Sequence, residues 1–273
     1  MIAELCCTLP QDAGIMERRR LLQWLAVGGF GTTLGLGTIG LERSLAEEGK
    51  HWGYIGATGP EAWGKLAPEY QACQAGTQQS PIALEQAIKA DLAEFALNYQ
   101  SIPLTILNNG HTVQVNAIAG NTLTLDGEVF ELKQFHLHHP SEHTLNGKPF
   151  PMEAHFVHAN AKQELAVVGV FLQAGAANPV WQTVLSAMPP QPTPAKTIGK
   201  TQIDLKQLLP SDRAFFRYFG SLTTPPCSEV VRWVVMETPV TLSQSQIQQF
   251  SALFPLNARP VQAMNRRFLL RSR

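Results

Sequence analysis

The segment 134–158 constrains the fold of this chain more than any other, because six of the chain's eight histidines lie within it. In a β-strand alternate side chains share a face, so His136 and His138 point the same way. Prolines and an Asn-Gly pair then indicate a loop, and His155 follows in a second alternating run. If the two runs form an antiparallel hairpin, three imidazoles converge on one point.

Three neutral imidazoles that leave a fourth position open to water are the ligand set of a catalytic zinc site. We therefore expect His136, His138 and His155 to bind Zn2+. Gln134 and Glu153 lie on the same strand faces and suit hydrogen bonds to the outer N–H groups of these ligands. A single strand histidine is more often structural than a ligand, so structural roles are assigned to the other histidines of the segment, His139, His143 and His158.

The length and charge of the chain limit the classes of protein to which it can belong. Its 273 residues suit a single domain with a large core, and they include 21 basic and 21 acidic side chains. This balance, without a basic stripe, lacks the electrostatic signature of nucleic-acid binding. We therefore exclude nucleic acid as a partner.

The first residues resemble a targeting segment. Three arginines at 18–20 precede an apolar, glycine-rich run at 21–41, and small residues follow at 44–46. This pattern predicts a cleaved, twin-arginine-like signal peptide over 1–46 and a mature domain over 47–273, exported to the periplasm or to another extracytoplasmic space such as a thylakoid lumen. The competing interpretation is an uncleaved membrane anchor, since about 20 apolar residues can span a bilayer. The glycines of the run favour cleavage, so no stable membrane anchor is expected.

Cleavage would remove Cys6 and Cys7 and leave Cys73 and Cys227 as the only thiols. An even number of cysteines in an exported protein indicates a disulfide. Two free, buried thiols are the alternative.

Several short alternating runs predict further strands. Asn-Gly and Asp-Gly pairs between apolar runs predict hairpins over 104–115 and 123–132. The continuous apolar run 165–172 predicts a central strand buried on both faces, and 230–236 predicts another strand. Strands therefore dominate this part of the chain.

Helices are expected to be few and peripheral. Capping residues predict short helices from 179 to about 188 and over 243–250. The segment 51–83, called here the N-terminal arm, shows no periodicity and is expected to be irregular but packed, with Trp52 and Trp63 as anchors. The predicted fold class is a β-dominated α+β single domain.

A series of motifs, in order, resembles the α-class carbonic anhydrases of the bacterial, exported type. They are Gln79-Ser80-Pro81-Ile82, Asn109-Gly110-His111, Gln134-Phe135-His136-Leu137-His138, Ser141-Glu142-His143-Thr144, Glu153-Ala154-His155-Phe156-Val157-His158 and Ser221-Leu222-Thr223-Thr224-Pro225-Pro226. The resemblance runs from His51 nearly to the C-terminus. It implies a central, twisted, mostly antiparallel sheet of ten strands with zinc at the base of a conical cleft.

The resemblance also implies the chemistry. Zinc lowers the pKa of its bound water to about 7, and the resulting hydroxide attacks carbon dioxide to form bicarbonate. Thr223 accepts a hydrogen bond from the hydroxide and donates one to Glu142, and His111 carries the released proton away. An apolar pocket for the substrate is implied at Val157, Val167, Leu222, Thr224, Val231 and Trp233.

Other implications of the resemblance concern the surroundings of the metal. Outer hydrogen bonds are implied between Gln134 and His136, between Glu153 and His155, and between the Asn257 carbonyl and His138. Cys73 and Cys227 match the cysteine pair of exported members. Sulfonamides and anions are the expected inhibitors. The sequence does not indicate an oligomeric state.

Two other classes of protein share part of this sequence pattern. A cupin would use Glu142 as a metal ligand in the pattern His136-x-His138-x3-Glu142, but residues 150–152 lack the Pro-x-Gly of its second motif. A catalytically silent, carbonic-anhydrase-related binding module usually lacks a zinc histidine, whereas this chain keeps all three. The sequence therefore favours an active enzyme.

Overall fold

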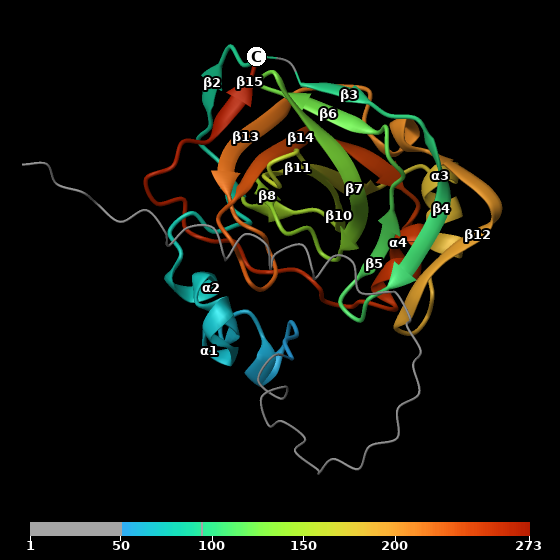
Figure 1. Ribbon diagram of the computed structural model, residues 1–273, viewed down its shortest axis with the longest axis horizontal. Coiled ribbons are helices and arrows are strands. Elements are labelled where there is room, and N and C mark those ends of the chain that lie inside the picture. The colour runs from blue at the N-terminus through green and yellow to red at the C-terminus, as the bar shows by residue number, and fades with distance from the viewer. Residues whose placement is uncertain (1–50, 94) are drawn as a thin grey trace, which may run out of the picture. The chain divides into compact units, whose positions relative to one another are not determined.

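The structure is a computed structural model that describes residues 51–93 and 95–273 (Figure 1). The predicted signal peptide, 1–46, lies outside the described residues. Within the described residues, no helix is both long and apolar enough to cross a membrane.

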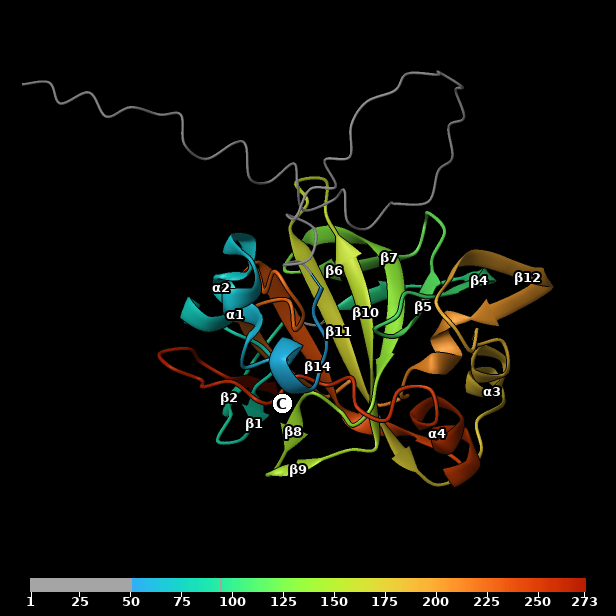
Figure 2. The same ribbon diagram turned by 90° about the horizontal axis from the view of Figure 1, so that it is seen from below.

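A single large sheet organises these residues (Figures 1 and 2). Ten of its strands follow one another in the order β12-β4-β5-β7-β10-β11-β14-β13-β15-β2. Their bounds are β2 Ile88–Ala90, β4 Ser101–Asn108, β5 Val113–Asn116, β7 Glu128–His138, β10 Met152–Ala159, β11 Leu165–Ala174, β12 Thr193–Asp204, β13 Phe215–Gly220, β14 Val231–Leu242 and β15 Leu270–Ser272. All pairs in this sheet are antiparallel except β11 with β14 and β15 with β2.

The sheet has twelve strands rather than the expected ten, because β3 (Ala96–Asn98) and β6 (Thr122–Leu125) join it beside β7. The reason is the length of β7, which has 11 residues. Its first part, 128–131, pairs with β6, whereas 134–136 pair with β5. One strand edge thus serves two partners. A separate small sheet contains β1 Ala83–Leu84, β8 Thr144–Leu145 and β9 Lys148–Pro149.

The predicted hairpins are confirmed. Strands β7 and β10 pair antiparallel with His136 opposite His155. The Asn-Gly turn joins β4 to β5, and the Asp-Gly turn joins β6 to β7 with Asp126 at φ 52° and Gly127 at φ 78°. Positive φ at both central residues is what a tight two-residue hairpin turn requires. The central strand predicted over 165–172 is β11, and its first eight residues are buried.

The two faces of the sheet carry separate apolar cores. Phe135 and Phe156 belong to the larger core, to which α3 and α4 also contribute. Val157 belongs to the second core. Because side chains alternate along a strand, His136 and His155 share the face of the second core, away from Phe135 and Phe156.

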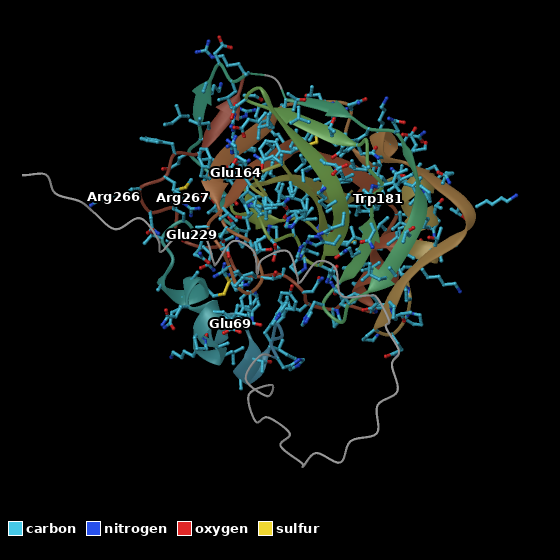
Figure 3. The ribbon with its side chains drawn as sticks, viewed as in Figure 1. Glu69, Glu164, Trp181, Glu229, Arg266 and Arg267 are labelled. Atoms are coloured by element: carbon cyan, nitrogen blue, oxygen red, sulfur yellow. A yellow bond between two sulfur atoms is a disulfide. The ribbon has the colours of Figure 1, made fainter. Side chains whose placement is uncertain are left out.

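Both predicted helices are present within two residues of their expected bounds, as α3 (Pro179–Ser186) and α4 (Gln244–Ser251). The Asn178 side chain accepts hydrogen bonds from two amides in the first turn of α3, and Ser243 forms a capping box at α4. Trp181 of α3, labelled in Figure 3, is fully buried and packs edge-on against a ring of β7.

The N-terminal arm is packed, as predicted, but it is less irregular than expected. It contains α1 (Trp63–Leu66) and α2 (Ala72–Ala75), together with two 3-10 turns at Gly56–Thr58 and Pro68–Tyr70; a further 3-10 turn, Leu205–Leu208, follows β12. Helices this short show too little periodicity to be recognised in sequence. Trp63 is fully buried and its indole N–H donates to two main-chain carbonyls, whereas Trp52 is half-buried.

His158 lies on the face of the larger core, where it is fully buried. Its Nε2 is 2.6 Å from the Tyr99 hydroxyl, and its Nδ1 is 3.2 Å from the Ala166 carbonyl oxygen. Burial lowers the pKa of His158 to about 4, despite the main-chain carbonyls that favour its charged form. The folded protein therefore resists protonation here, whereas the unfolded chain protonates near pH 6.5.

Folding stability should consequently fall as the pH drops from about 6.5 toward 4, because only the unfolded chain gains this proton in that window. The loss at His158 approaches about 3 kcal/mol. Urea unfolding at pH 7 and pH 5 should show a smaller pH dependence for His158→Gln than for the parent protein. His51→Gln, at an exposed position, is the control. Parallel losses in the parent and in His158→Gln would contradict this prediction.

Candidate metal centre

Three imidazoles meet where β7 and β10 pair. His136 and His138 come from β7 and His155 from β10, and one ring nitrogen of each lies within 4.8 Å of the others. The hairpin register explains this convergence, because His136 and His155 are direct cross-strand partners and His138 lies two residues further along the same face. The structure thus brings together the three predicted ligand side chains.

The second ring nitrogen of each imidazole already has a hydrogen-bond partner. These contacts join His136 Nδ1 to Gln134 Oε1 at 2.8 Å, His138 Nδ1 to the Asn257 carbonyl oxygen at 2.8 Å, and His155 Nε2 to Glu153 Oε1 at 2.9 Å. The inner nitrogens that remain are Nε2 of His136, Nε2 of His138 and Nδ1 of His155. Among the described residues, His138 Nε2 is one of the few buried polar atoms without a hydrogen-bond partner. A buried acceptor nitrogen of this kind suits a metal ion.

The three imidazoles are also in the protonation state that a metal requires. Burial lowers the pKa of all three, that of His138 to about 4 and that of His136 well below its ordinary value. The rings are therefore neutral at pH 7, so binding a cation displaces no proton from them. This donor set, three neutral imidazoles, fits zinc.

Glu153 holds the centre together from the outside. Its Oε1 accepts from the rings of His155 and His143, and its Oε2 accepts from the amides of Glu142 and His143. Burial alone would raise the pKa of Glu153, but the two histidines and these bonds outweigh burial and hold it well below its usual range. His143, Glu153 and His155 also lie close enough to bind an ion, yet His143 Nδ1 and His155 Nε2 are both engaged in hydrogen bonds to Glu153 Oε1. Gly169 faces Glu153 across the sheet, and a Cβ there would come within 2.9 Å of Oε1.

Glu142 lies beside the triad and is 2% exposed. Its Oε1 accepts from the Arg259 amide at 2.9 Å, and its Oε2 has no hydrogen-bond partner. Burial raises the pKa of Glu142 to about 7, although His155, the Arg259 amide and the nearby Thr223 hydroxyl all favour the carboxylate. Thr223 itself is 6% exposed.

An apolar wall adjoins the triad on the same face of the sheet. Val157, Val167 and Trp233 are successive cross-strand neighbours on β10, β11 and β14. The Trp233 ring centroid is 4.9 Å from that of His155. Val231 lies in the same core cluster, and the half-buried Leu222 packs against it. Of the predicted pocket residues, Thr224 is not part of this cluster; its carbonyl accepts from the Cys227 amide.

The His111 side chain is half-buried rather than freely exposed in its turn. Its ring stacks on Trp52 with centroids 3.7 Å apart and planes 7° apart, beside a cavity of about 310 Å3. Burial, followed by the neighbouring His51, lowers the pKa of His111 to about 4.

The side chains that support the centre from further away could not be predicted from the sequence. Tyr218 lies 2.7 Å from His143 Nε2 and 3.0 Å from Ser80 Oγ, and Arg259 holds Glu142. No spacing in the sequence relates these residues to the histidines. Ser80 and His143 both occur in the motifs given above, and their presence there was the one sequence feature that pointed to this supporting network. The structure also contains the predicted disulfide between Cys73 and Cys227.

The fold and the site together define a β-sheet protein with a buried three-histidine centre that is suited to a catalytic metal. Residues 58–273 match the family model of eukaryotic-type carbonic anhydrases, and the chain belongs to that family. A carbonic anhydrase of Nostoc sp. is 45% identical over 260 residues, which cover 93% of this chain and 97% of the relative. One of Pectobacterium atrosepticum is 46% identical over 226 residues, which cover 82% of this chain and 92% of the relative. A solved structure of α-carbonic anhydrase from Thermovibrio ammonificans with the inhibitor sulfanilamide is 46% identical and has a TM-score of 0.78, covering 81% of this chain and 98% of that chain.

The chain is accordingly a carbonic anhydrase, an enzyme that catalyses the reversible hydration of carbon dioxide to bicarbonate and a proton. The α-class carbonic anhydrases are zinc enzymes, and the histidine triad could hold such an ion. The family match decides against the cupin alternative. The geometry agrees, since Glu142 is absent from the group of side chains that could share one metal with His136, His138 and His155.

Proposed function

We propose that this enzyme binds zinc through Nε2 of His136, Nε2 of His138 and Nδ1 of His155. The observation that carries the proposal is the set of outer hydrogen bonds, which occupies the other nitrogen of each ring and fixes its orientation. When bound, zinc supplies a Lewis acid that lowers the pKa of a coordinated water to about 7. The residues of the chain then orient the nucleophile, hold the carbon dioxide and carry away the released proton.

In this proposal Glu142 and Thr223 orient the nucleophile. Glu142 Oε2 is a buried acceptor, so it can accept a hydrogen bond from the nearby Thr223 hydroxyl. Because its O–H donates to Glu142, the Thr223 oxygen can only accept a hydrogen bond from the nucleophile. This bond favours the geometry in which a lone pair of the nucleophile points at carbon dioxide.

The apolar wall formed by Val157, Val167, Leu222, Val231 and Trp233 suits the substrate. Carbon dioxide has no charge and no net dipole, so it loses little hydration on entering this pocket. Bicarbonate is charged and returns to water. This difference in hydration between carbon dioxide and bicarbonate favours uptake of the substrate and release of the product.

The test is stopped-flow carbon dioxide hydration by the purified chain, with the zinc content determined on the same sample. About one zinc per chain and fast hydration are expected. A sulfonamide should abolish the activity, since a similar enzyme was solved with sulfanilamide; simple anions should inhibit as well. Full zinc occupancy without hydration would instead support the silent binding module.

We also propose that His111 carries the released proton to solvent. While it is stacked on Trp52, a ring with a pKa of about 4 takes up little proton at neutral pH. Rotation off Trp52 into water returns the pKa toward about 6.5, which suits proton transfer near neutral pH. In this proposal the His111 imidazole stacks on the ring of Trp52 between proton transfers.

Replacing His111 with alanine should lower kcat in weak buffer by about 10- to 100-fold. The value of kcat/KM should remain near that of the parent, because proton release follows bicarbonate formation. Added imidazole should restore part of the rate, and zinc content should stay normal. An unchanged kcat in weak buffer would exclude His111 as the shuttle.

We further propose that residues 1–46 are a cleaved signal peptide, that 47–273 form the mature enzyme and that it acts in the periplasm or another extracytoplasmic space. The arginines at 18–20 before an apolar run support export. The disulfide also supports it, because such bonds persist in oxidising compartments. The N-terminal residue of the exported protein tests the cleavage site.

A further inference from the structure

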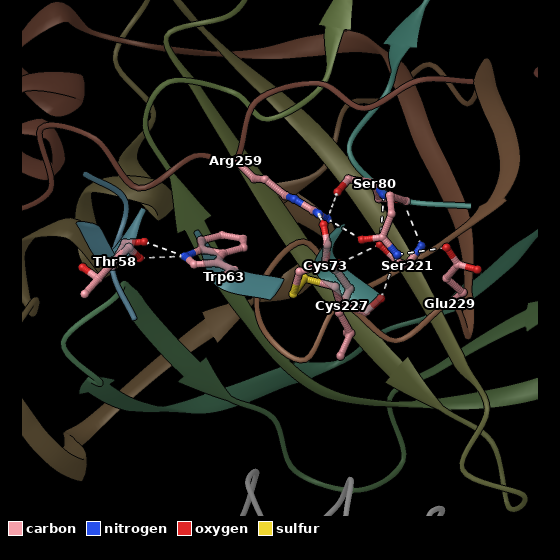
Figure 4. Close-up of a disulfide and its surroundings, with 11 residues drawn as sticks. Thr58, Trp63, Cys73, Ser80, Ser221, Cys227, Glu229 and Arg259 are labelled. Atoms are coloured by element: carbon pink, nitrogen blue, oxygen red, sulfur yellow. Dashed lines mark hydrogen bonds between the residues drawn. A yellow bond between two sulfur atoms is a disulfide. The ribbon is translucent and has the colours of Figure 1, made fainter. Parts of the chain in front are cut away.

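Arg259 is a buried arginine with an unusual set of partners. It is 2% exposed, and its guanidinium donates to Gln79 Oε1 at 2.9 Å and to the main-chain carbonyls of Ser80 and Cys73, both at 2.8 Å (Figure 4). The guanidinium carbon also lies 5.6 Å from the centroid of the Trp63 ring. Burying a cation is costly unless several groups replace its water. Here three oxygens bind the two terminal nitrogens and an aromatic face lies against the group, while the buried Nε has no hydrogen-bond partner. The bonds to the terminal nitrogens fix the plane of the guanidinium.

The main chain of the same residue holds Glu142. The Arg259 amide donates to Glu142 Oε1 at 2.9 Å, which leaves Oε2 free of any hydrogen-bond partner. This amide is the main-chain donor that holds the Glu142 carboxylate, and the nearby Thr223 hydroxyl also favours its charged form. The direction of Oε2 therefore depends on where the Arg259 main chain lies.

The acceptors of the guanidinium belong to the disulfide-bonded part of the N-terminal arm. Cys73 is bonded to Cys227, which follows Thr223 by four residues. Gln79 reinforces the link, since its side-chain amide donates to the Cys227 carbonyl at 3.0 Å. One rigid assembly thus contacts both the arginine that holds Glu142 and the turn that carries Thr223.

We propose that Arg259 is a positioning residue for carbon dioxide hydration, which ties Glu142 to the disulfide-bonded arm and so keeps the carboxylate aligned with Thr223. The inference rests on the proposed role of Glu142. Its physical basis is the planar fork of arginine, which binds several acceptors in one fixed plane. Lysine keeps the charge but acts as a compact point charge on a flexible stem and cannot reproduce that plane.

The test compares Arg259→Lys with Arg267→Lys. Arg267, labelled in Figure 3, also lies over an aromatic ring, that of Tyr218, and also donates to main-chain carbonyls, including that of Gln79, but it has no bond to Glu142. We expect Arg259→Lys to lower kcat/KM for hydration about tenfold at unchanged zinc content, since small misplacements of reacting groups have effects of this size. Arg267→Lys should change kcat/KM less than about twofold. Equal values of kcat/KM for the two variants would overturn the proposal.

A second comparison separates positioning from general loosening of the fold. Glu142→Ala alone should lower kcat/KM, and Arg259→Lys added to it should cause no further loss. If Arg259→Lys lowers kcat/KM by the same factor with and without Glu142, the arginine does not act through the carboxylate and the inference is wrong. If Glu142→Ala alone keeps full activity, the proposed role of Glu142 fails instead.

Should Arg259→Lys fail to fold, Gln79→Met provides the same test. It removes one acceptor of the guanidinium, together with the Gln79 donor to the Cys227 carbonyl and to Glu229, and leaves Glu142 and the arginine charge in place. A loss of kcat/KM that disappears in the Glu142→Ala background supports the proposal, and a loss that persists there overturns it.

Discussion

Replacing His138 with alanine is expected to abolish carbon dioxide hydration and to empty the zinc site. Removing even an outer partner of a metal ligand costs roughly 10- to 100-fold in affinity or activity, so losing one of three direct ligands should cost more than about 100-fold. The buried Nε2 of His138 has no hydrogen-bond partner in the structure. Zinc content and kcat/KM, measured on the same samples, check the result.

The neighbouring His139 offers a matched control. Its Nδ1 lies 3.0 Å from the Pro255 carbonyl oxygen, and it is not part of the triad. His139→Ala should keep its zinc and most of its activity. After removal of the metal by a chelator, added zinc should restore His139→Ala but not His138→Ala. A His138→Ala variant that keeps both zinc and full activity would refute the proposed ligand set.

Breaking the Cys73–Cys227 disulfide should produce the largest loss of stability among the changes considered. The bond joins residues 154 positions apart, and constraining so long a loop in the unfolded chain stabilises the fold by up to roughly 5 kcal/mol. The double variant Cys73→Ser/Cys227→Ser should therefore unfold at a clearly lower urea concentration, with a free energy of unfolding lower by about 2–5 kcal/mol.

A reductant provides the control for this prediction. Reduction of the parent protein should lower its urea midpoint to that of the double variant, and the reductant should leave the double variant unchanged. Complete reduction of the bond in the parent protein without any shift of the midpoint would contradict the entropic argument.

Much of the fold could be predicted because the signals are local. The turn at Asp126-Gly127 requires only that two adjacent residues adopt positive φ, the turn at Asn109-Gly110 places Gly110 alone there, and both hairpins are present. The fully apolar run of β11 and the caps of α3 and α4 are equally local features.

Other strands escaped prediction because their sequences carry little pattern. Strand β12, Thr193–Asp204, is mostly exposed and contains no alternating apolar residues, since it pairs with β4 at the edge of the sheet. Strand β13, Phe215–Gly220, is short, and its place between β14 and β15 depends on residues far along the chain. Pairings of this kind are selected by packing over long sequence separations, which local patterns do not encode.

The convergence of the three histidines follows from the sequence alone, because a period of two along each strand and one antiparallel return place His136, His138 and His155 on a common face. Tertiary structure decided which nitrogen of each ring is free and what holds the Glu142 carboxylate. The Asn257 carbonyl contacts His138 from 119 residues away, and the Arg259 amide contacts Glu142 from 117 residues away. Such contacts form only once the whole sheet has closed these long loops, and no periodicity within a single strand can specify them.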